Sequence, residues 1–178
     1  MMHTIRVDRV LRETVNTPYA DLVTRATGAA VRTSIRQTIA GLAGGTTLLD
    51  FSDVGLVDWS CADEVVAKLL LETTDEISVV LGGLREEQSE AIGHVLAGHE
   101  LAVVSHETPG GVPRLLGRVG RDAQEAFDYI QQKGTIAAEA LALALGWDSP
   151  TARGALEALA RLRLIRRSGT TFTPLPLP

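Results

Sequence analysis

Residues 48–66 read Leu48-Leu49-Asp50-Phe51-Ser52-Asp53-Val54-Gly55-Leu56-Val57-Asp58-Trp59-Ser60-Cys61-Ala62-Asp63-Glu64-Val65-Val66, and the residue pattern changes twice along them. The stretch begins as a short apolar run typical of a buried strand, passes through a turn, and ends as an apolar helix. A strand that leads into a helix is the unit from which α/β domains are built. We therefore expect an α/β domain in this part of the chain.

Strand and helix patterns alternate on both sides of this stretch. Strands are expected at 46–51, 77–81 and 101–105, and helices at 31–42, 62–72 and 85–97. Connections long enough to hold a helix favour a mainly parallel or mixed sheet with covering helices. The segment 5–15 is expected to supply one or two further strands.

A second, smaller domain is expected to begin near residue 120. The segment 108–113 contains glycine and proline and interrupts the alternation, and beyond residue 120 the pattern is helical. Helices are expected at 122–132, 136–145 and 149–162. The third is predicted to begin with Ser149 as its N-cap and Pro150 at its first position.

The C-terminal part of this second domain is predicted to contain a β-hairpin. Two β-capable pieces flank Ser168-Gly169 within 164–174, and the ending Pro174–Pro178 is expected to be a loose tail. Three helices followed by a hairpin are the layout of a winged helix. The predicted domains are thus an α/β domain over residues 1–119 and a winged helix over 120–178.

Composition narrows the class of protein. The 178 residues are 45% hydrophobic and 22% charged, which is an ordinary globular balance and excludes an intrinsically disordered chain. The single cysteine, Cys61, excludes an internal disulfide and a cysteine-rich metal cage. No secretory leader and no apolar run of membrane-spanning length is present, so the expected location is the cytoplasm.

Charge is distributed unevenly between the two predicted domains. Residues 1–120 contain 10 Lys and Arg against 16 Asp and Glu, a net charge of −6, whereas residues 121–178 contain 7 against 6, a net charge of +1. The relatively basic second domain permits contact with nucleic acid without requiring it.

The stretch 48–66 resembles the STAS superfamily, the domain of bacterial anti-sigma-factor antagonists, in which a strand ending in acidic and glycine residues leads to a helix start containing Asp and Ser. It is more closely similar to the STAS-like domains of unknown function, because Ala62-Asp63-Glu64 matches the end of their corresponding stretch and Val31-Arg32 with Ile35 fits their preceding helix. The resemblance covers roughly residues 15–108 and implies a domain that binds a protein partner.

In the antagonists a serine at this helix start is phosphorylated by an ATPase of the histidine-kinase-like fold, and Ser60 is the matching position. The resemblance therefore implies Ser60 as a phosphorylation candidate. The alternative is a structural role, because Ser60 with Asp63 three residues on is also an N-capping pattern. Trp59 departs from the small residue of the antagonists, and Asp58, Asp63 and Glu64 would repel a phosphate.

Several residues are expected to form the partner-binding surface. Trp59 is either a half-exposed anchor or a buried side chain at the sheet edge. Arg25, Arg32 and Arg36 either receive an acidic partner or form a solvated helix face. The candidate partner-binding set is Asp58, Trp59, Ser60, Asp63, Arg25, Arg32 and Arg36.

Signatures of catalysis are missing. The phosphate-binding, dinucleotide-binding, zinc-protease and nucleophile-elbow motifs do not occur, so no enzymatic activity, cofactor or metal is expected. His94 and His99 are five residues apart and would point to different faces of a helix. Gly82-Gly83 is either a tight turn or a ligand loop, and carboxylates near Cys61 oppose a reactive thiolate there.

The third helix and the hairpin of the winged helix supply the candidate DNA-binding residues Thr151, Arg153, Arg161, Arg163, Arg166 and Arg167. These are few contacts for a monomer, and a homodimer would double them. The expected function is a regulator, in transcriptional control, that couples a partner-binding STAS-like domain to a winged helix. The alternatives are a protein-interaction adaptor without DNA binding and a small-molecule sensor.

Overall fold

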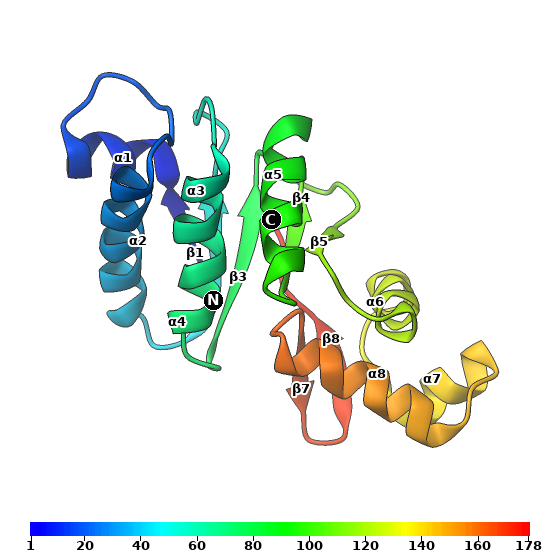
Figure 1. The fold of residues 1–178 in the computed structure, drawn as a ribbon. Coiled ribbons are helices and arrows are strands. Elements are labelled where there is room, and N and C mark those ends of the chain that lie inside the picture. Colours follow the sequence, from blue (N-terminus) through cyan, green and yellow to red (C-terminus); the bar gives the residue numbers. More distant parts are fainter. The chain divides into compact units, whose positions relative to one another are not determined.

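A computed structural model describes all residues from Met1 to Pro178. The chain forms two compact units, one of residues Met1–Arg118 with Leu177–Pro178 and one of residues Val119–Pro176 (Figure 1). The division falls between Arg118 and Val119, whereas the predicted domains were 1–119 and 120–178, and Leu177–Pro178 belong to unit 1 and not to the second domain. None of the helices combines the length and the apolarity that crossing a membrane requires.

Unit 1 contains one five-stranded mixed sheet. Its strands lie in the order β1-β2-β3-β4-β5 and are β1 (Met2–Arg6), β2 (Gly45–Asp50), β3 (Ile77–Gly82), β4 (Ala102–His106) and β5 (Arg114–Gly117). The first four strands are parallel, and β5 is antiparallel to β4. The predicted α/β class and the mainly parallel, mixed sheet are confirmed.

The helices of unit 1 connect the parallel strands. They are α1 (Val7–Val15), α2 (Arg25–Ala40), α3 (Trp59–Ala62), the π-helical turn η1 (Asp63–Lys68), α4 (Leu69–Glu72) and α5 (Glu86–Gly98). Because strand order follows chain order, right-handed crossovers place every connecting helix on the same face of the sheet. Figure 1 shows α2, the α3–α4 segment and α5 side by side over that face.

The core of unit 1 lies between this face and the helices. The sheet contributes buried side chains such as Leu49 and Leu81, and α2 contributes Val31, Ile35 and Ile39, which are at most 3% exposed. The aliphatic spacing that predicted a helix over 31–42 is therefore the spacing of its buried face.

The segment 5–15, expected to supply one or two further strands, supplies only the end of one strand, and the expectation was wrong for residues 7–15. Strand β1 ends at Arg6, and residues Val7–Val15 form helix α1. Val7 and Leu11, one helical turn apart, are fully buried, and Arg12 pairs with the buried Asp8 four residues earlier at 3.1 Å. Nine residues are too few for the periodicity alone to separate helix from strand.

Unit 2 consists of α6 (Arg121–Lys133), β6 (Ile136–Ala137), α7 (Ala138–Leu145), α8 (Ser149–Arg161), β7 (Ile165–Ser168) and β8 (Thr171–Pro174). The three strands form an antiparallel sheet in the order β6-β8-β7. Phe127, Leu141, Leu156 and Phe172 are buried and come from three helices and the hairpin. The two-residue strand β6 was not predicted, since its pairing partner β8 lies far along the chain.

Two details of unit 2, at the start of α8 and in the C-terminal segment, differ from expectation. The N-cap of α8 is Asp148, whose carboxylate accepts a hydrogen bond from the Thr151 amide at 2.7 Å, so Ser149 is the first helical residue and not the cap. The expected loose tail begins later than residue 174, because Pro174 pairs with Ile165 and the side chain of Leu175 is buried.

Candidate functional site

Asp58 organises the start of helix α3. Its carboxylate accepts hydrogen bonds from the Cys61 amide at 2.8 Å, the Ser60 hydroxyl at 2.7 Å and the Thr24 amide at 2.9 Å. Partial burial raises the pKa of Asp58, but these hydrogen bonds outweigh it and hold the pKa below its ordinary value. Asp58 therefore remains ionised at neutral pH and joins α3 to the segment before α2.

The interpretation of Ser60 as the N-cap of this helix was wrong. Asp58 is the capping residue, because its side chain reaches the third amide of the helix, and Ser60 stands at the second helical position. The Ser60 side chain is half-buried, and its hydroxyl donates to Asp58. A carboxylate thus contacts the oxygen that the resemblance implies as a phosphate acceptor.

Trp59 is exposed, so the alternative of a buried tryptophan was wrong. Its residue is 60% exposed, and its ring centroid lies 4.4 Å from that of His94 on α5. The two rings contact each other at an interplanar angle of 31°, and the tryptophan stays largely exposed. A tryptophan held in this way presents a large apolar surface at little further entropic cost to a binding partner.

Three further apolar residues in the segments that precede α2 and α3 are exposed, namely Tyr19 at 72%, Leu56 at 60% and Val23 at 41%. Hydrogen bonds join their two segments: the Leu22 amide donates to the Leu56 carbonyl at 2.8 Å, and the Gly55 amide to the Ala20 carbonyl at 2.7 Å. We call Tyr19, Val23, Leu56 and Trp59 the apolar patch. Sequence reasoning found Trp59 alone, because apolar residues in loops carry no periodic signal.

Gln88, also missed from the sequence, fixes the loop that carries the patch. It is 1% exposed, and its side-chain amide donates to the carbonyls of Val54 and Gly55 at 3.0 Å and 2.5 Å. Its carbonyl accepts from the Arg85 amide at the start of α5 at 2.9 Å. The loop before α3 is therefore anchored to α5.

The arginines of α2 are paired within the chain. Arg25 donates to Asp63 at 2.7 Å and to Glu64 at 2.9 Å, Arg32 donates to Glu64, and Arg36 donates to Glu72 at 3.0 Å. These ion pairs were not expected, but the side chains of Arg25 and Arg36 are still 54% and 52% exposed, in keeping with the solvated face that was one of the two interpretations. The three arginines join α2 to the α3–α4 segment.

Glu64 is the centre of this ion-pair network. It is 3% exposed and also accepts a hydrogen bond from Lys68 at 2.7 Å. Burial raises the pKa of Glu64, but Lys68, Arg25 and Arg32 outweigh burial and lower it overall. Asp63, beside it, has a lowered pKa for the same reason: hydrogen bonds from Arg25 and His99 outweigh partial burial.

Cys61 is a core residue. It is fully buried, and its thiol donates to the Thr24 carbonyl at 3.0 Å. Burial, with the nearby Asp58 carboxylate, raises the pKa of the thiol to about 12. The thiolate that a nucleophile or a metal ligand requires does not form near neutral pH.

The Gly82-Gly83 turn is closely packed. Gly83 has φ of +70°, and a Cβ there would lie 2.8 Å from the Ser52 amide nitrogen. A tight strand-to-helix turn thus explains the glycine pair. Nowhere in the chain do three or more His, Cys, Asp or Glu side chains gather in a way that could hold a metal ion.

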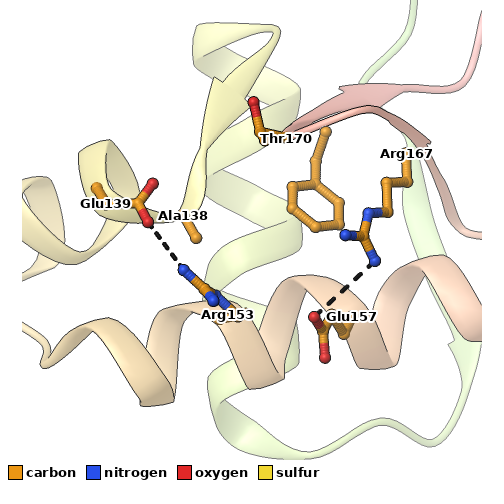
Figure 2. A pocket seen from close by; sticks show the side chains of 7 residues that line it. Ala138, Glu139, Arg153, Glu157, Arg167 and Thr170 are labelled. Carbon is orange, nitrogen blue, oxygen red and sulfur yellow. Dashed lines mark hydrogen bonds and ion pairs between the residues drawn. The ribbon is translucent and has the colours of Figure 1, made fainter.

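In unit 2 a pocket of about 330 Å³ lies among α7, α8 and the β7–β8 hairpin (Figure 2). Two candidate DNA-binding residues, Arg153 and Arg167, line it together with Glu139, Glu157 and Phe172. Arg153 donates to Glu139 at 2.9 Å, and Arg167 lies 4.0 Å from Glu157 with its guanidinium 5.8 Å from the Phe172 ring centroid. Each arginine in the pocket is therefore matched by a carboxylate.

The other candidate DNA-binding residues lie outside this pocket. Thr151 is half-buried in the first turn of α8, and Arg161 is exposed at its last residue. Arg163 has a left-handed backbone with φ of 60° in the turn after α8, and Arg166 is half-buried on β7. The structure thus brings Arg153 and Arg167 to one pocket and leaves the remaining four distributed along α8, the turn after it and β7.

Comparisons with known proteins identify no relative, since no family model, no curated protein and no solved structure matches this chain.

Proposed function

We propose that the chain is a cytoplasmic, non-enzymatic regulator in transcriptional control, in which unit 1 is a STAS-like domain that binds a protein partner and unit 2 is a winged helix that binds double-stranded DNA. The observation that carries the proposal is the exposure of Trp59 at the start of α3, 60% open and held against His94 within the apolar patch. Exposed aromatic residues in apolar surroundings are typical anchors of protein interfaces.

The resemblance to anti-sigma-factor antagonists suggests an ATPase of the histidine-kinase-like fold as the partner. The patch is rigidly supported, because Asp58 and Gln88 tie its loop to α3 and α5. A preformed surface loses little entropy on binding. Ser60 lies at the same helix start, so its phosphorylation would place a dianion next to the docked partner.

The partner-binding proposal is tested by titrating the labelled chain with purified histidine-kinase-like ATPases from its own organism. Trp59→Ala and Leu56→Ala are expected to weaken binding at least tenfold, as alanine substitution does at interface hot spots. Leu71→Ala is the matched control, because Leu71 is 59% exposed on α4 and lies outside the patch. Equal affinities for all three variants would refute docking through the patch.

Unit 2 supports the DNA-binding part through its order of elements. Helix α8 precedes an antiparallel hairpin, as a recognition helix precedes the wing, and its residues 153 and 154 are exposed. Fluorescence anisotropy with random duplex at low and high salt tests this part. Binding at low salt that weakens steeply as salt increases is expected, and no binding at low salt would refute it.

A second candidate function, a protein-interaction adaptor without DNA binding, is favoured by one observation. The pairs Arg153–Glu139 and Arg167–Glu157 balance the charge of the pocket between α8 and the hairpin. A protein partner that carries both charges would complement this surface. The small-molecule sensor has no comparable support, since the Gly82-Gly83 turn is packed against Ser52.

A further inference from the structure

Helix α8 presents one guanidinium and one carboxylate on a single face. Arg153 and Glu157 are four residues apart, which places them one helical turn apart on the same side, and both line the pocket of unit 2 (Figure 2). Their side chains are 56% and 42% exposed. A molecule that contacts this face of α8 therefore meets a donor and an acceptor together.

The charge of this face does not suit the phosphate backbone. Phosphate contacts are made by cations and neutral donors, whereas the pocket contains Glu139 and Glu157 beside its two arginines. Base edges in the major groove have different requirements. Guanine accepts two hydrogen bonds from one guanidinium, and the amino group of cytosine donates to a carboxylate.

Gly154, next to Arg153, is an exposed glycine inside the helix. Apart from its chain neighbours and the backbone of its own helix, a Cβ at this position would meet no atom within 4 Å, and the residue has no positive φ. Glycine within a helix lowers stability relative to alanine, and here no internal packing explains it. Absence of a side chain beside Arg153 allows another molecule to approach the helix closely.

Arg153 is also placed where a recognition helix reads bases. It is the fifth residue of α8, and helices of this type contact base edges with their N-terminal residues. We propose, on the basis of the proposed DNA binding by unit 2, that Arg153 and Glu157 read a G·C base pair in the major groove. Arg153 donates to guanine, Glu157 accepts from cytosine, and Gly154 permits the close approach.

In the free protein Glu139 holds Arg153 in position. The 2.9 Å hydrogen bond comes from α7, so the guanidinium is already extended over the pocket before DNA arrives. Guanine binding exchanges this ion pair for two hydrogen bonds to the base.

The proposal is tested by selecting duplexes from a random library with the full chain and measuring affinities of the selected site by anisotropy. The expected site contains an essential G·C pair, and replacing it with A·T weakens binding on the order of tenfold. Arg153→Ala is expected to abolish the preference for guanine. Glu157→Gln is expected to weaken the preference for cytosine in the same base pair. Selected sites without an essential G·C pair, or an Arg153→Ala variant with unchanged preference, would overturn the proposal.

Gly154→Ala separates a binding role from a structural one. This variant is expected to unfold at a higher temperature than the wild type and yet bind the selected duplex several-fold more weakly. Gly98→Ala is the control, because Gly98 also lies in a helix with open space around it but belongs to unit 1. Unchanged affinity of Gly154→Ala would overturn the close approach.

The outcomes also distinguish this proposal from the proposed function. If no duplex binds at any salt concentration, DNA binding by unit 2 fails and base reading fails with it, which leaves the adaptor. If duplex binds without base preference, DNA binding stands and base reading is refuted.

Discussion

The hydroxyl of Ser60 donates a hydrogen bond of 2.7 Å to the carboxylate of Asp58, the residue that caps helix α3. The same carboxylate holds the Thr24 amide before α2 and the Cys61 amide within α3. Any group added to the Ser60 oxygen therefore contacts the carboxylate that joins two segments of unit 1. Capping of α3 and any change at the Ser60 oxygen therefore depend on the same carboxylate.

Introducing a negative charge at Ser60 is expected to weaken this junction. Ser60→Asp places a second carboxylate beside Asp58 and should reduce the free energy of unfolding by about 1 kcal/mol, the size of a lost N-cap. Ser60→Ala removes only the hydroxyl and should cost less. Urea unfolding followed by circular dichroism measures both, and a Ser60→Asp variant as stable as Ser60→Ala would show that Asp58 tolerates the charge.

Removing the carboxylate of Glu64 is expected to destabilise unit 1 strongly. Glu64→Gln leaves Arg32, whose side chain is 18% exposed, without its main counter-charge. Breaking a buried ion pair on one side costs about 3 kcal/mol. Arg36→Gln is the control, because the Arg36 side chain is 52% exposed. This substitution should lower the free energy of unfolding by well under half as much as Glu64→Gln does. If urea unfolding shows that Glu64→Gln and Arg36→Gln lower the free energy of unfolding equally, Glu64 is not the centre of the network.

Acid is expected to destabilise the protein through the same groups. The pKa values of Asp58, Asp63 and Glu64 are lower in the folded chain than their ordinary values. The stability they contribute is therefore fully present above the unfolded-state pKa values of about 4, and it is lost as pH falls through the folded values. The free energy of unfolding, measured between pH 7 and pH 3, should decrease as the pH falls. In the Glu64→Gln variant this decrease should be smaller. An unchanged pH dependence in that variant would contradict the assignment.

Local patterns predicted most of the elements that place these residues. Buried strands such as β3 appear as continuous apolar runs, and α2 as a repeat of aliphatic residues, so both were found from the sequence. Capping was harder to predict, because each helix start offers an aspartate and a serine within two positions, Asp58 with Ser60 and Asp148 with Ser149, and both residue types favour the N-cap. Only the backbone geometry shows which side chain reaches the free amide.

Long-range pairing could not be predicted from such patterns. Arg25 and Asp63 are 38 positions apart, and nothing local indicates that α2 and η1 face each other with these side chains. The apolar patch was missed for a related reason, since the bridge between Leu22 and Val57 brings two irregular segments together. For Trp59 the sequence allowed burial or exposure equally, and packing against His94 decided the outcome.

The thiol of Cys61 is expected to be unreactive in the folded protein. Its raised pKa, about 12, keeps the thiolate fraction negligible at pH 8, and the residue is fully buried. A thiol reagent such as Ellman's reagent should label the native chain far more slowly than the chain in 8 M urea. Because the chain contains one cysteine, the native rate also reports opening of unit 1. Complete labelling of the folded chain within seconds would show that this part of the core opens readily.

Alanine at Gly83 is expected to destabilise the turn after β3. The backbone there has φ of +70°, which non-glycine residues adopt at a cost, and the added Cβ would lie 2.8 Å from the Ser52 amide nitrogen. The two effects together should lower the free energy of unfolding by about 2 kcal/mol or more. Gly98→Ala provides the comparison, because its Cβ meets no neighbour within 4 Å and its φ is ordinary, so no loss is expected. If Gly83→Ala unfolds at the wild-type urea concentration, the turn can shift away from Ser52 without cost. Tight packing would then no longer explain the glycine pair, and a ligand-binding role for Gly82-Gly83 would regain support.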